Sequence, residues 1–272
     1  MKSRLVLLLK GFFVGGTMLV PGVSGGTMCI ILGIYEELIS SVSSFFKHKK
    51  KSFWFLTIFT IGAILGMIIC AKPLLGLIQK YNEPMMYLFI GAVIGGVPAI
   101  LRASGERRVS KSMVIYVFLG VVIVSTLSLI PAGLFSGNDP KGIVGMVLLV
   151  VAGFVAAIAL VLPGISVSYM LLLMGMYEET VKAVSELYLP YLLPLGGGLV
   201  LGIVLTTKIL ETAMNKYKKG THLIILGFIV GSVIPILPGA PSGINLIVCP
   251  FTALIGFGII QLLEFVDRKR LY

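Results

Sequence analysis

Charged residues are scarce in this sequence. Only 12% of the chain is Asp, Glu, Lys or Arg, whereas 57% is hydrophobic and the mean hydropathy is +1.06. Soluble domains contain about 25% charged residues, so this chain cannot supply the polar surface that a water-soluble fold needs. The composition therefore predicts a protein embedded in a membrane.

Cysteine and histidine are also rare. Cys29, Cys70 and Cys249 all lie in apolar segments, so neither a disulfide framework nor a thiolate metal site is expected. The two histidines, His48 and His222, are assigned to basic loops, and no His, Asp and Glu residues have metal-ligand spacing. A P-loop, a dinucleotide fingerprint and a serine nucleophile elbow are missing as well. We therefore expect no enzyme activity, no metal and no cofactor.

Long apolar runs recur along the chain. Most have about 17 to 22 residues, enough at a rise of about 1.5 Å per residue to cross a hydrocarbon core about 30 Å thick. These runs lie at residues 54–71, 85–101, 113–134, 142–162, 189–209 and 246–265, with a shorter one at 223–237. A lipid-exposed strand edge would leave backbone groups unpaired, and the hydrophobicity is continuous rather than alternating. We predict an all-α, multi-pass membrane protein.

The net charge of +11 is interpreted as membrane topology rather than as a nucleic-acid site. We assume that the N-terminus is cytoplasmic and that the region 5–46 enters the membrane and returns. Of the 22 Lys and Arg residues, those that then fall outside are Lys72, Lys80, Lys141 and Lys182. This bias predicts that both termini and residues 47–51 are cytoplasmic and that residues 136–141 are external. Contact between the basic loops and anionic lipid heads is a secondary role.

The chain contains an internal repeat. Residues 21–37, PGVSGGTMCIILGIYEE, align without a gap on residues 163–179, PGISVSYMLLLMGMYEE. The match resumes after a six-residue shortening, and its later pairs include Gly62 with Gly198. Shared Pro-Gly-x-Ser and Tyr-Glu-Glu segments in fixed order indicate a duplication rather than chance similarity of composition. The predicted repeats are residues 1–141 and residues 142–272.

The two repeats are expected to have opposite orientations. Each holds a returning hairpin with a broken helix, followed by three spans, so the chain finishes the first repeat on the opposite side of the membrane. The loop 47–51 is basic, whereas its counterpart keeps only Lys182, which agrees with inversion. Inverted repeats are typical of secondary transporters, which bind substrate near the midplane. A channel can be built in the same way, and whether the broken segments are re-entrant or full spans stays open.

The repeated motif predicts an anion site. Pro21 and Pro163 each follow an apolar run, and Pro-Gly-x-Ser disfavours continued helix. A helix is expected to restart after each break, with Ser24 or Ser166 at its N-cap and free N–H groups that bind anions. The alternative is a proline kink with close packing of small residues, and we favour it for Gly33 and Gly175. The predicted substrate-binding residues of the two breaks are Pro21, Gly22, Ser24, Gly25, Gly26, Thr27, Pro163, Gly164, Ser166, Ser168 and Tyr169.

Charged residues outside the breaks form a second group of candidates. Lys72 and Lys208 end equivalent spans and are either snorkelling anchors or mouths that attract phosphate. Arg102 is an orientation signal that is also best placed to contact a departing head group. Gating or coupling is assigned to residues about three helical turns past the breaks, with ordinary interfacial carboxylates as the alternative. These gating candidates are Tyr35, Glu36, Tyr177 and Glu178.

The two motif copies resemble those of PopT, a family of bacterial and archaeal polyprenyl-phosphate transporters that was formerly of unknown function. The resemblance covers essentially the whole chain, including its length, both copies and their spacing. It implies that the substrate is undecaprenyl phosphate, the lipid carrier of cell-wall precursors, returned from the outer to the inner leaflet for reuse. Val167 departs from the glycine that is usual in this family. The motif residues carried over by position are Pro21, Gly22, Ser24, Gly25, Gly26, Thr27, Tyr35 and Glu36, then Pro163, Gly164, Ser166, Ser168, Tyr177 and Glu178.

Such a substrate is physically sensible, because a phosphate is costly to move through hydrocarbon whereas an isoprenoid tail prefers lipid. The protein would shelter only the head group while the repeats rock. A small-anion transporter or channel and a scaffold for envelope proteins stay open as alternatives. The expected partners are a polyprenyl phosphate and the bilayer of the bacterial cytoplasmic membrane, without nucleic acid. A homo-oligomer and a coupling ion stay open.

Overall fold

A computed structural model describes residues 2–18, 24–106, 109–127 and 142–268. Within these ranges the regular structure is helical and contains no strand, which confirms the predicted all-α class. The helices before residue 128 are α1 Lys2–Thr17, α2 Gly25–Ile31, α3 Tyr35–Ser43, α4 Lys49–Lys80, α5 Asn82–Ser104 and α6 Lys111–Leu127. Those that follow are α7 Gly142–Val161, α8 Val167–Leu173, α9 Tyr177–Ser185, α10 Leu189–Lys216, α11 Lys218–Val233, the 3-10 turn η1 Ile234–Ile236 and α12 Asn245–Arg268.

Five of these helices are long and apolar enough to cross a membrane, namely α4, α5, α7, α10 and α12. The chain is therefore a multi-pass membrane protein, as predicted. The apolar helix α6 is shorter, and the end of the predicted run 113–134 lies outside the described residues. Helices α1, α2 and α3 have 16, 7 and 9 residues, too short to span alone. Helices α2 and α3 are bent by 119°, as in a broken span or a re-entrant loop.

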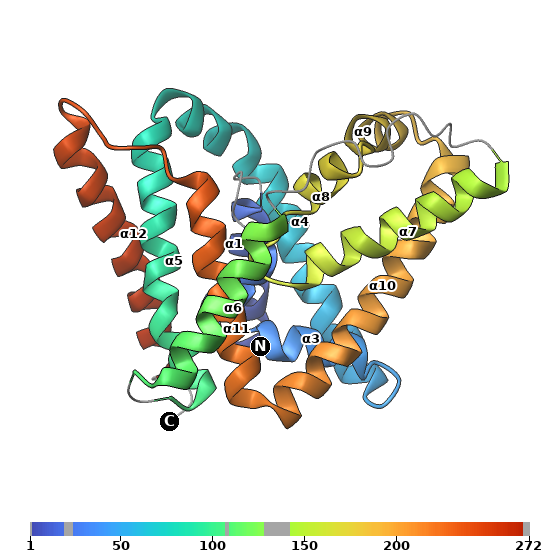
Figure 1. Cartoon of the computed structure of the whole chain (residues 1–272), viewed down its shortest axis with the longest axis horizontal. Helices are drawn as coiled ribbons and strands as arrows, with labels where there is room; N and C mark the ends of the chain where they lie inside the picture. The colour runs from blue at the N-terminus through green and yellow to red at the C-terminus, as the bar shows by residue number, and fades with distance from the viewer. Residues whose placement is uncertain (1, 19–23, 107–108, 128–141, 269–272) are drawn as a thin grey trace.

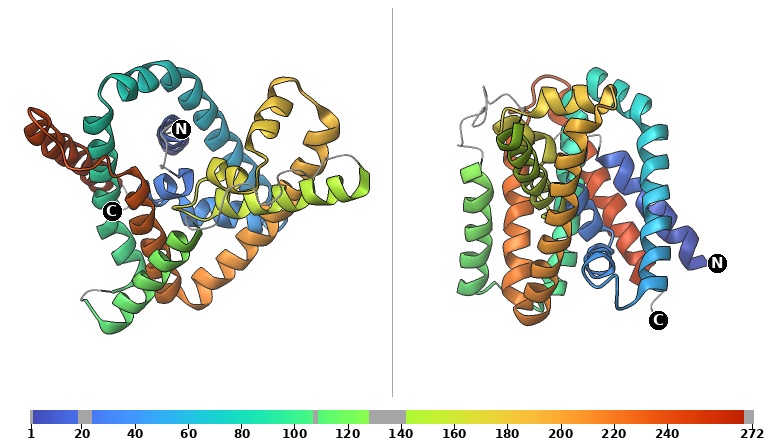
Figure 2. Two further views of the ribbon diagram at one scale, coloured as in Figure 1. Left: turned by 45° about the horizontal axis from the view of Figure 1, so that its top comes forward. Right: turned by 90° about the vertical axis from the view of Figure 1, so that its right-hand side faces the viewer.

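The long helices pack in pairs that recur along the chain. Helix α1 packs on α4 as α7 packs on α10, and α5 packs on α12 as α11 packs on α6. Figures 1 and 2 show the α5–α12 pair and the α7–α10 pair on opposite flanks. Gly62 lies directly against the carbonyl of Leu8, and Gly198 lies directly against the carbonyl of Val150. These two contacts are equivalent in the sequence repeat, so both halves use the same close helix crossing.

Equivalent elements lie at opposite ends of the molecule. Figure 1 shows α3 and the corner between α10 and α11 at one end, and α9 and the corner between α4 and α5 at the other. This placement is what an inverted repeat requires. The boundary between the predicted repeats falls at residue 141, outside the described residues. The division into 1–141 and 142–272 therefore stays a prediction.

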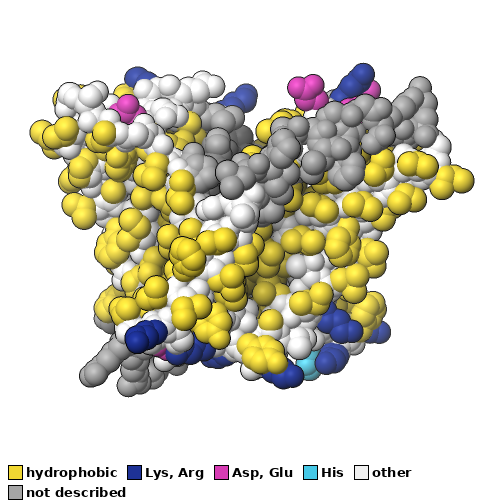
Figure 3. Space-filling model, viewed as in Figure 1, with side chains coloured by type: hydrophobic (Ala, Val, Ile, Leu, Met, Phe, Trp, Pro, Cys, Tyr) yellow, Lys and Arg dark blue, Asp and Glu magenta, His cyan; other side chains and the backbone are white. Residues whose placement is uncertain are grey.

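An apolar belt separates two charged ends (Figure 3). We call the end that contains the α3–α4 turn and the α10–α11 corner the basic end, because exposed lysines gather there. They are Lys47, Lys49, Lys50, Lys51, Lys216, Lys218 and Lys219. The positive-inside bias predicts that the basic end is cytoplasmic. The loop 136–141, predicted to be external, lies outside the described residues.

The largest apolar core surrounds the two short helices of the first half. It joins Met28 and Ile31 of α2 and Ile39 of α3 to Leu210 of α10 and Ile229 of α11. Burial of these side chains fixes the two short helices against both halves, with α2 packed on α1 and α5 and α3 packed on α4 and α10. The first break is therefore held by contacts with residues that are distant in the sequence.

Candidate functional site

Both helices restart where the repeated motif predicts. Helix α2 begins at Gly25 after Ser24, and α8 begins at Val167 after Ser166, with extended backbone at each serine. The Ser166 hydroxyl accepts a hydrogen bond from the Tyr169 N–H at 3.4 Å, as an N-cap should. The Ser24 side chain makes no capping bond, so its predicted capping role is wrong. Pro21 and Gly22 lie outside the described residues.

The two breaks meet in the interior of the protein. The hydroxyl of Thr27, at the start of α2, accepts a hydrogen bond from the Gly164 N–H at 3.1 Å. Gly26 packs against the Pro163 backbone so closely that a Cβ at residue 26 would lie 3.2 Å from the Pro163 Cα. Thr27 is 2% exposed, and Pro163 is fully buried. We call this contact between α2 and the α7–α8 break the junction.

Tyr35 supports the junction from the start of α3. Its hydroxyl donates to the carbonyl oxygen of Val161 at 2.8 Å, and its side chain is only 4% exposed. Val161 is the last residue of α7, whose carbonyl has no partner in its own helix. Tyr35 therefore satisfies a buried acceptor of the second half. Its sequence counterpart, Tyr177, is 39% exposed.

Glycine is required in the motif for two different reasons. Gly164 has φ +83°, and an added Cβ would collide with the carbonyl of Phe228 on α11. Gly33 and Gly175 have φ +66° and +73°, and an added Cβ at Gly33 would meet no atom within 4 Å. The close-packing interpretation of Gly33 is therefore wrong, and that of Gly175 stays a prediction. They are glycines because each ends a short helix in the left-handed conformation.

The remaining binding candidates are distributed around the junction or away from it. Gly25 and Tyr169 are partly buried, whereas Ser168 is exposed. Lys72 and Lys208 are exposed within α4 and α10, which continue to Lys80 and Lys216. Arg102 is exposed in the last turn of α5. The structure thus brings Gly26, Thr27, Pro163 and Gly164 together and leaves the three basic candidates on outer helix faces.

His222 was assigned to a basic loop from the sequence, and this assignment is wrong. It lies in α11 and is only 6% exposed. Its Nδ1 is 2.7 Å from the carbonyl oxygen of Lys218, and its Nε2 is 2.9 Å from Oε1 of Glu36. The signal in the sequence was its place directly before the apolar run 223–237, which allows the helix to begin earlier. Glu36 thus contacts the second half although its side chain is 62% exposed, and Glu178 is exposed as well.

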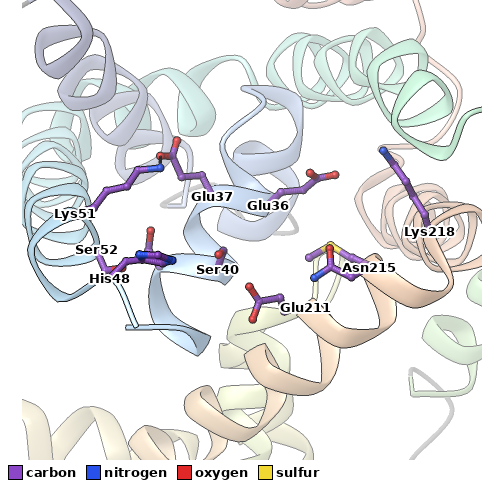
Figure 4. A pocket seen from close by; sticks show the side chains of 11 residues that line it. Glu36, Glu37, Ser40, His48, Lys51, Ser52, Glu211, Asn215 and Lys218 are labelled. Carbon is purple, nitrogen blue, oxygen red and sulfur yellow. Dashed lines mark ion pairs between the residues drawn. The ribbon is translucent and has the colours of Figure 1, made fainter. Parts of the chain in front are cut away.

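A polar cavity of about 530 Å³ lies beside this contact (Figure 4). It is lined by α3, the start of α4, the end of α10 and the start of α11. Glu37 pairs with Lys51 at 3.4 Å across it. Glu211 of α10 accepts hydrogen bonds from Ser43 at 2.5 Å and from Ser44 at 3.2 Å. The cavity therefore mixes both signs of charge at the interface of the two halves, and the part of the chain that the structure describes holds no cluster suited to a metal ion.

The sequence model of the undecaprenyl phosphate translocase-like family matches residues 14–243 of this chain. The chain belongs to this family. The resemblance to this family that the two motif copies indicated is therefore confirmed. The matched region includes the residues of the junction and of the Glu36–His222 contact.

Two relatives extend this match over most of the chain. A protein of Staphylococcus aureus named polyprenyl-phosphate transporter is 34% identical over 250 residues, covering 87% of this chain and 87% of the relative. A protein of Vibrio cholerae with the same name is 28% identical over 251 residues, covering 85% of this chain and 76% of the relative. No solved structure matches the chain.

Proposed function

We propose that this protein moves a polyprenyl phosphate, specifically undecaprenyl phosphate, from the outer to the inner leaflet of the bacterial cytoplasmic membrane. The family description and the names of both relatives support this substrate. The apolar belt and the long apolar helices support a site inside the bilayer. Those names describe translocation, so we propose transport without catalysis of a covalent step.

The proposed binding site for the phosphate rests on the junction. Helix starts from the two halves lie at one place because Thr27 bonds to Gly164 and Gly26 packs on Pro163. Each short helix has seven residues, so local N–H groups and hydroxyls, rather than a long helix dipole, would hold the phosphate. Because Gly164 already donates to Thr27, the donors for the head group come from the neighbouring residues of α2 and α8. Ser24, Ser166 and Ser168 supply hydroxyls there.

Leaflet exchange needs access to this site from both sides of the membrane. We propose that the two halves are inverted repeats that move against each other, with the α5–α11 contact between them. The lipid tail can remain in the bilayer, since only the phosphate requires shelter from hydrocarbon. The tail also concentrates the substrate in the membrane, so modest head-group affinity is enough.

The test is transfer of a fluorescent prenyl phosphate between the leaflets of vesicles that contain the purified protein. We expect transfer, with poor competition from inorganic phosphate. Gly26→Val should slow it strongly, because the new side chain would collide with the Pro163 backbone at the junction. Gly76→Val is the matched control, because a Cβ at residue 76 meets nothing within 4 Å. No transfer by the parent protein, or equally fast uptake of free phosphate, would contradict the proposal.

A further inference from the structure

The short helices α3 and α9, at the two ends of the protein, pack to different extents. Helix α3 packs against α10 and also against α4, and Ile39 and Ser41 on it are buried. Its counterpart α9 packs against α10 and α8, and no comparable contact joins it to α4 among the described residues. Figures 1 and 2 show α9 raised at the far end, while α3 lies inside the basic end. Helix α3 is thus packed against helices of both halves at the basic end.

The contact that ties α3 to α11 must contain an added proton. The Lys218 carbonyl can only accept a hydrogen bond, so His222 Nδ1, at 2.7 Å, carries a hydrogen and donates it. A neutral imidazole has a single N–H, which leaves Nε2 as an acceptor facing the Glu36 carboxylate at 2.9 Å. Two acceptors at this distance repel unless a proton lies between them. The contact therefore needs either a doubly protonated His222 or a protonated Glu36.

We propose that Glu36 and His222 form a binding site for a hydrogen ion that holds α3 closed over the basic end, and that release of this ion lets α3 leave α10 and α11. The proton site follows from the geometry alone, whereas its role as a gate rests on the proposed transport function. Once separated in water at about pH 8, histidine is neutral and glutamate is ionised. The closed state thus holds one proton more than the open state.

The other charged groups near this site have their own partners or favour the ionised pair. Glu37 is paired with Lys51. Glu211 is bound by serine hydroxyls of α3. Lys218, one helical turn before His222 in α11, adds a positive charge that favours the ionised form of the Glu36 carboxylate.

Two further groups complete these surroundings. Glu106, in the α5–α6 loop, accepts from Lys219 at 2.7 Å. Together with a hydrogen bond from Ser110, this contact lowers the pKa of the Glu106 carboxyl below its usual range, so Glu106 does not compete for the proton. His48 lines the cavity from the turn before α4. It is exposed and lies among lysines, so it is not part of the closed contact.

Among the described residues, the opposite end shows no equivalent of the Glu36–His222 contact. By the alignment of the repeats, Met86 stands in α5 where α11 has His222. Glu178, the counterpart of Glu36, is exposed like Glu36, whose side chain is 62% exposed, so the difference lies in the facing histidine. Within the described part of the chain, this hydrogen-ion site therefore belongs to the basic end. Acid should favour closure of this end, and alkaline pH should favour its opening.

The test uses the full chain in lipid nanodiscs, where both faces are accessible to reagents. Met214 of α10 lies 7% exposed against the α3 core, so Met214→Cys reports departure of α3. Its labelling rate with a water-soluble maleimide is divided by that of Phe46→Cys, an 83% exposed site that corrects for thiol chemistry. The parent chain gives the background from natural cysteines. We expect the ratio to rise between about pH 6 and about pH 8.5, by up to about tenfold per pH unit for one proton.

Two substitutions distinguish the proton site from a general effect of pH. Glu36→Gln supplies an amide N–H to His222 Nε2 without an added proton, so labelling of Met214→Cys should stay slow and become independent of pH. Glu37→Gln, the neighbouring surface carboxylate, should keep the parent's dependence. An unchanged pH dependence in Glu36→Gln overturns the proposal.

A spectroscopic measurement keeps the proposal testable if Glu36→Gln does not fold. Nitrogen NMR of the parent protein should show hydrogen on both ring nitrogens of His222 while α3 is closed. A neutral His222 ring with an ionised Glu36 overturns the proton site. Prenyl-phosphate transfer is measured on the same preparations. Absence of transfer at every pH contradicts the proposed function, whereas transfer with pH-independent labelling contradicts the proton site.

Discussion

Helices α3 and α9 begin with the same residues, Tyr-Glu-Glu, and each has nine residues, yet their surroundings differ. Tyr35 of α3 is 4% exposed and Tyr177 of α9 is 39% exposed. The helices facing α3 carry Glu211 and His222, where the equivalent positions of the other half carry Leu75 and Met86. Similar local sequences thus give similar helices, while the residues on the facing helices decide which short helix packs tightly against its neighbours.

The largest difference in the free energy of unfolding should come from apolar side chains at equivalent positions of α3 and α9. Ile39 is 3% exposed in the main core, whereas its counterpart Val181 is 51% exposed. Ile39→Ala should lower the free energy of unfolding by about 2–5 kcal/mol because it leaves a cavity. Val181→Ala should change it by about 0.5 kcal/mol or less. Unfolding in mixed detergent micelles measures both, and equal losses would contradict the asymmetry.

The close helix crossings should respond alike in the two halves. A Cβ at Gly62 or Gly198 would overlap a carbonyl of the facing helix, so Gly62→Ala and Gly198→Ala should each destabilise by about 1–3 kcal/mol. Gly76→Ala, in open space on α4, should be neutral or stabilise by up to about 1 kcal/mol through helix propensity. Thermal unfolding of the three variants is the measurement. A loss in only one of the two crossing variants would show that the halves do not share this scaffold.

The tyrosines that begin α3 and α9 offer a finer comparison. Tyr35→Phe leaves the Val161 carbonyl buried without its donor, with an expected loss of about 1–3 kcal/mol. Tyr177→Phe removes an exposed hydroxyl and should change stability by about 0.5 kcal/mol or less. The same unfolding assay compares them. A larger loss of stability for Tyr177→Phe than for Tyr35→Phe would contradict the tighter packing of α3.

The smallest effect concerns the two serines before the short helices. Ser166→Ala removes an N-cap bond and should lower stability by about 1 kcal/mol, whereas Ser24→Ala should change it little. Both variants should weaken binding of the phosphate head by about 1–3 kcal/mol if each hydroxyl donates to it. Prenyl-phosphate binding is measured beside stability. Full affinity in both variants would place the head group away from the junction.

Much of the architecture could be predicted from the sequence because it depends on short-range patterns. Apolar runs marked the long helices, and Pro-Gly-x-Ser marked both helix restarts at Gly25 and Val167. Hydropathy follows from composition within a window, and proline and glycine act on their own turn. The repeat also identified equivalent residues, such as Gly62 and Gly198, that occupy equivalent crossings.

Contacts between the halves could not be predicted in this way. The partners Tyr35 and Val161 lie 126 residues apart, and Glu36 and His222 lie 186 apart. The repeat aligns Glu36 with Glu178 and therefore suggests equal roles, whereas among the described residues tertiary packing pairs Glu36 with His222 and gives Glu178 no such partner. Ser24 and Ser166 also align, but only Ser166 caps its helix. Sequence similarity between repeats indicates shared backbone form and does not fix the conformational state of each half.

The hydrogen bond from Gly164 to Thr27 bears on how many lipid head groups one protein molecule can bind at a time. Two separate motif copies suggest two sites, each able to hold one anion. A contact that uses a side chain of one copy and the backbone of the other makes the two copies a single compartment. Two phosphates brought there would repel each other strongly in a medium of low dielectric constant. Each protein molecule should therefore hold one lipid head at a time, and a titration should saturate at one substrate per chain.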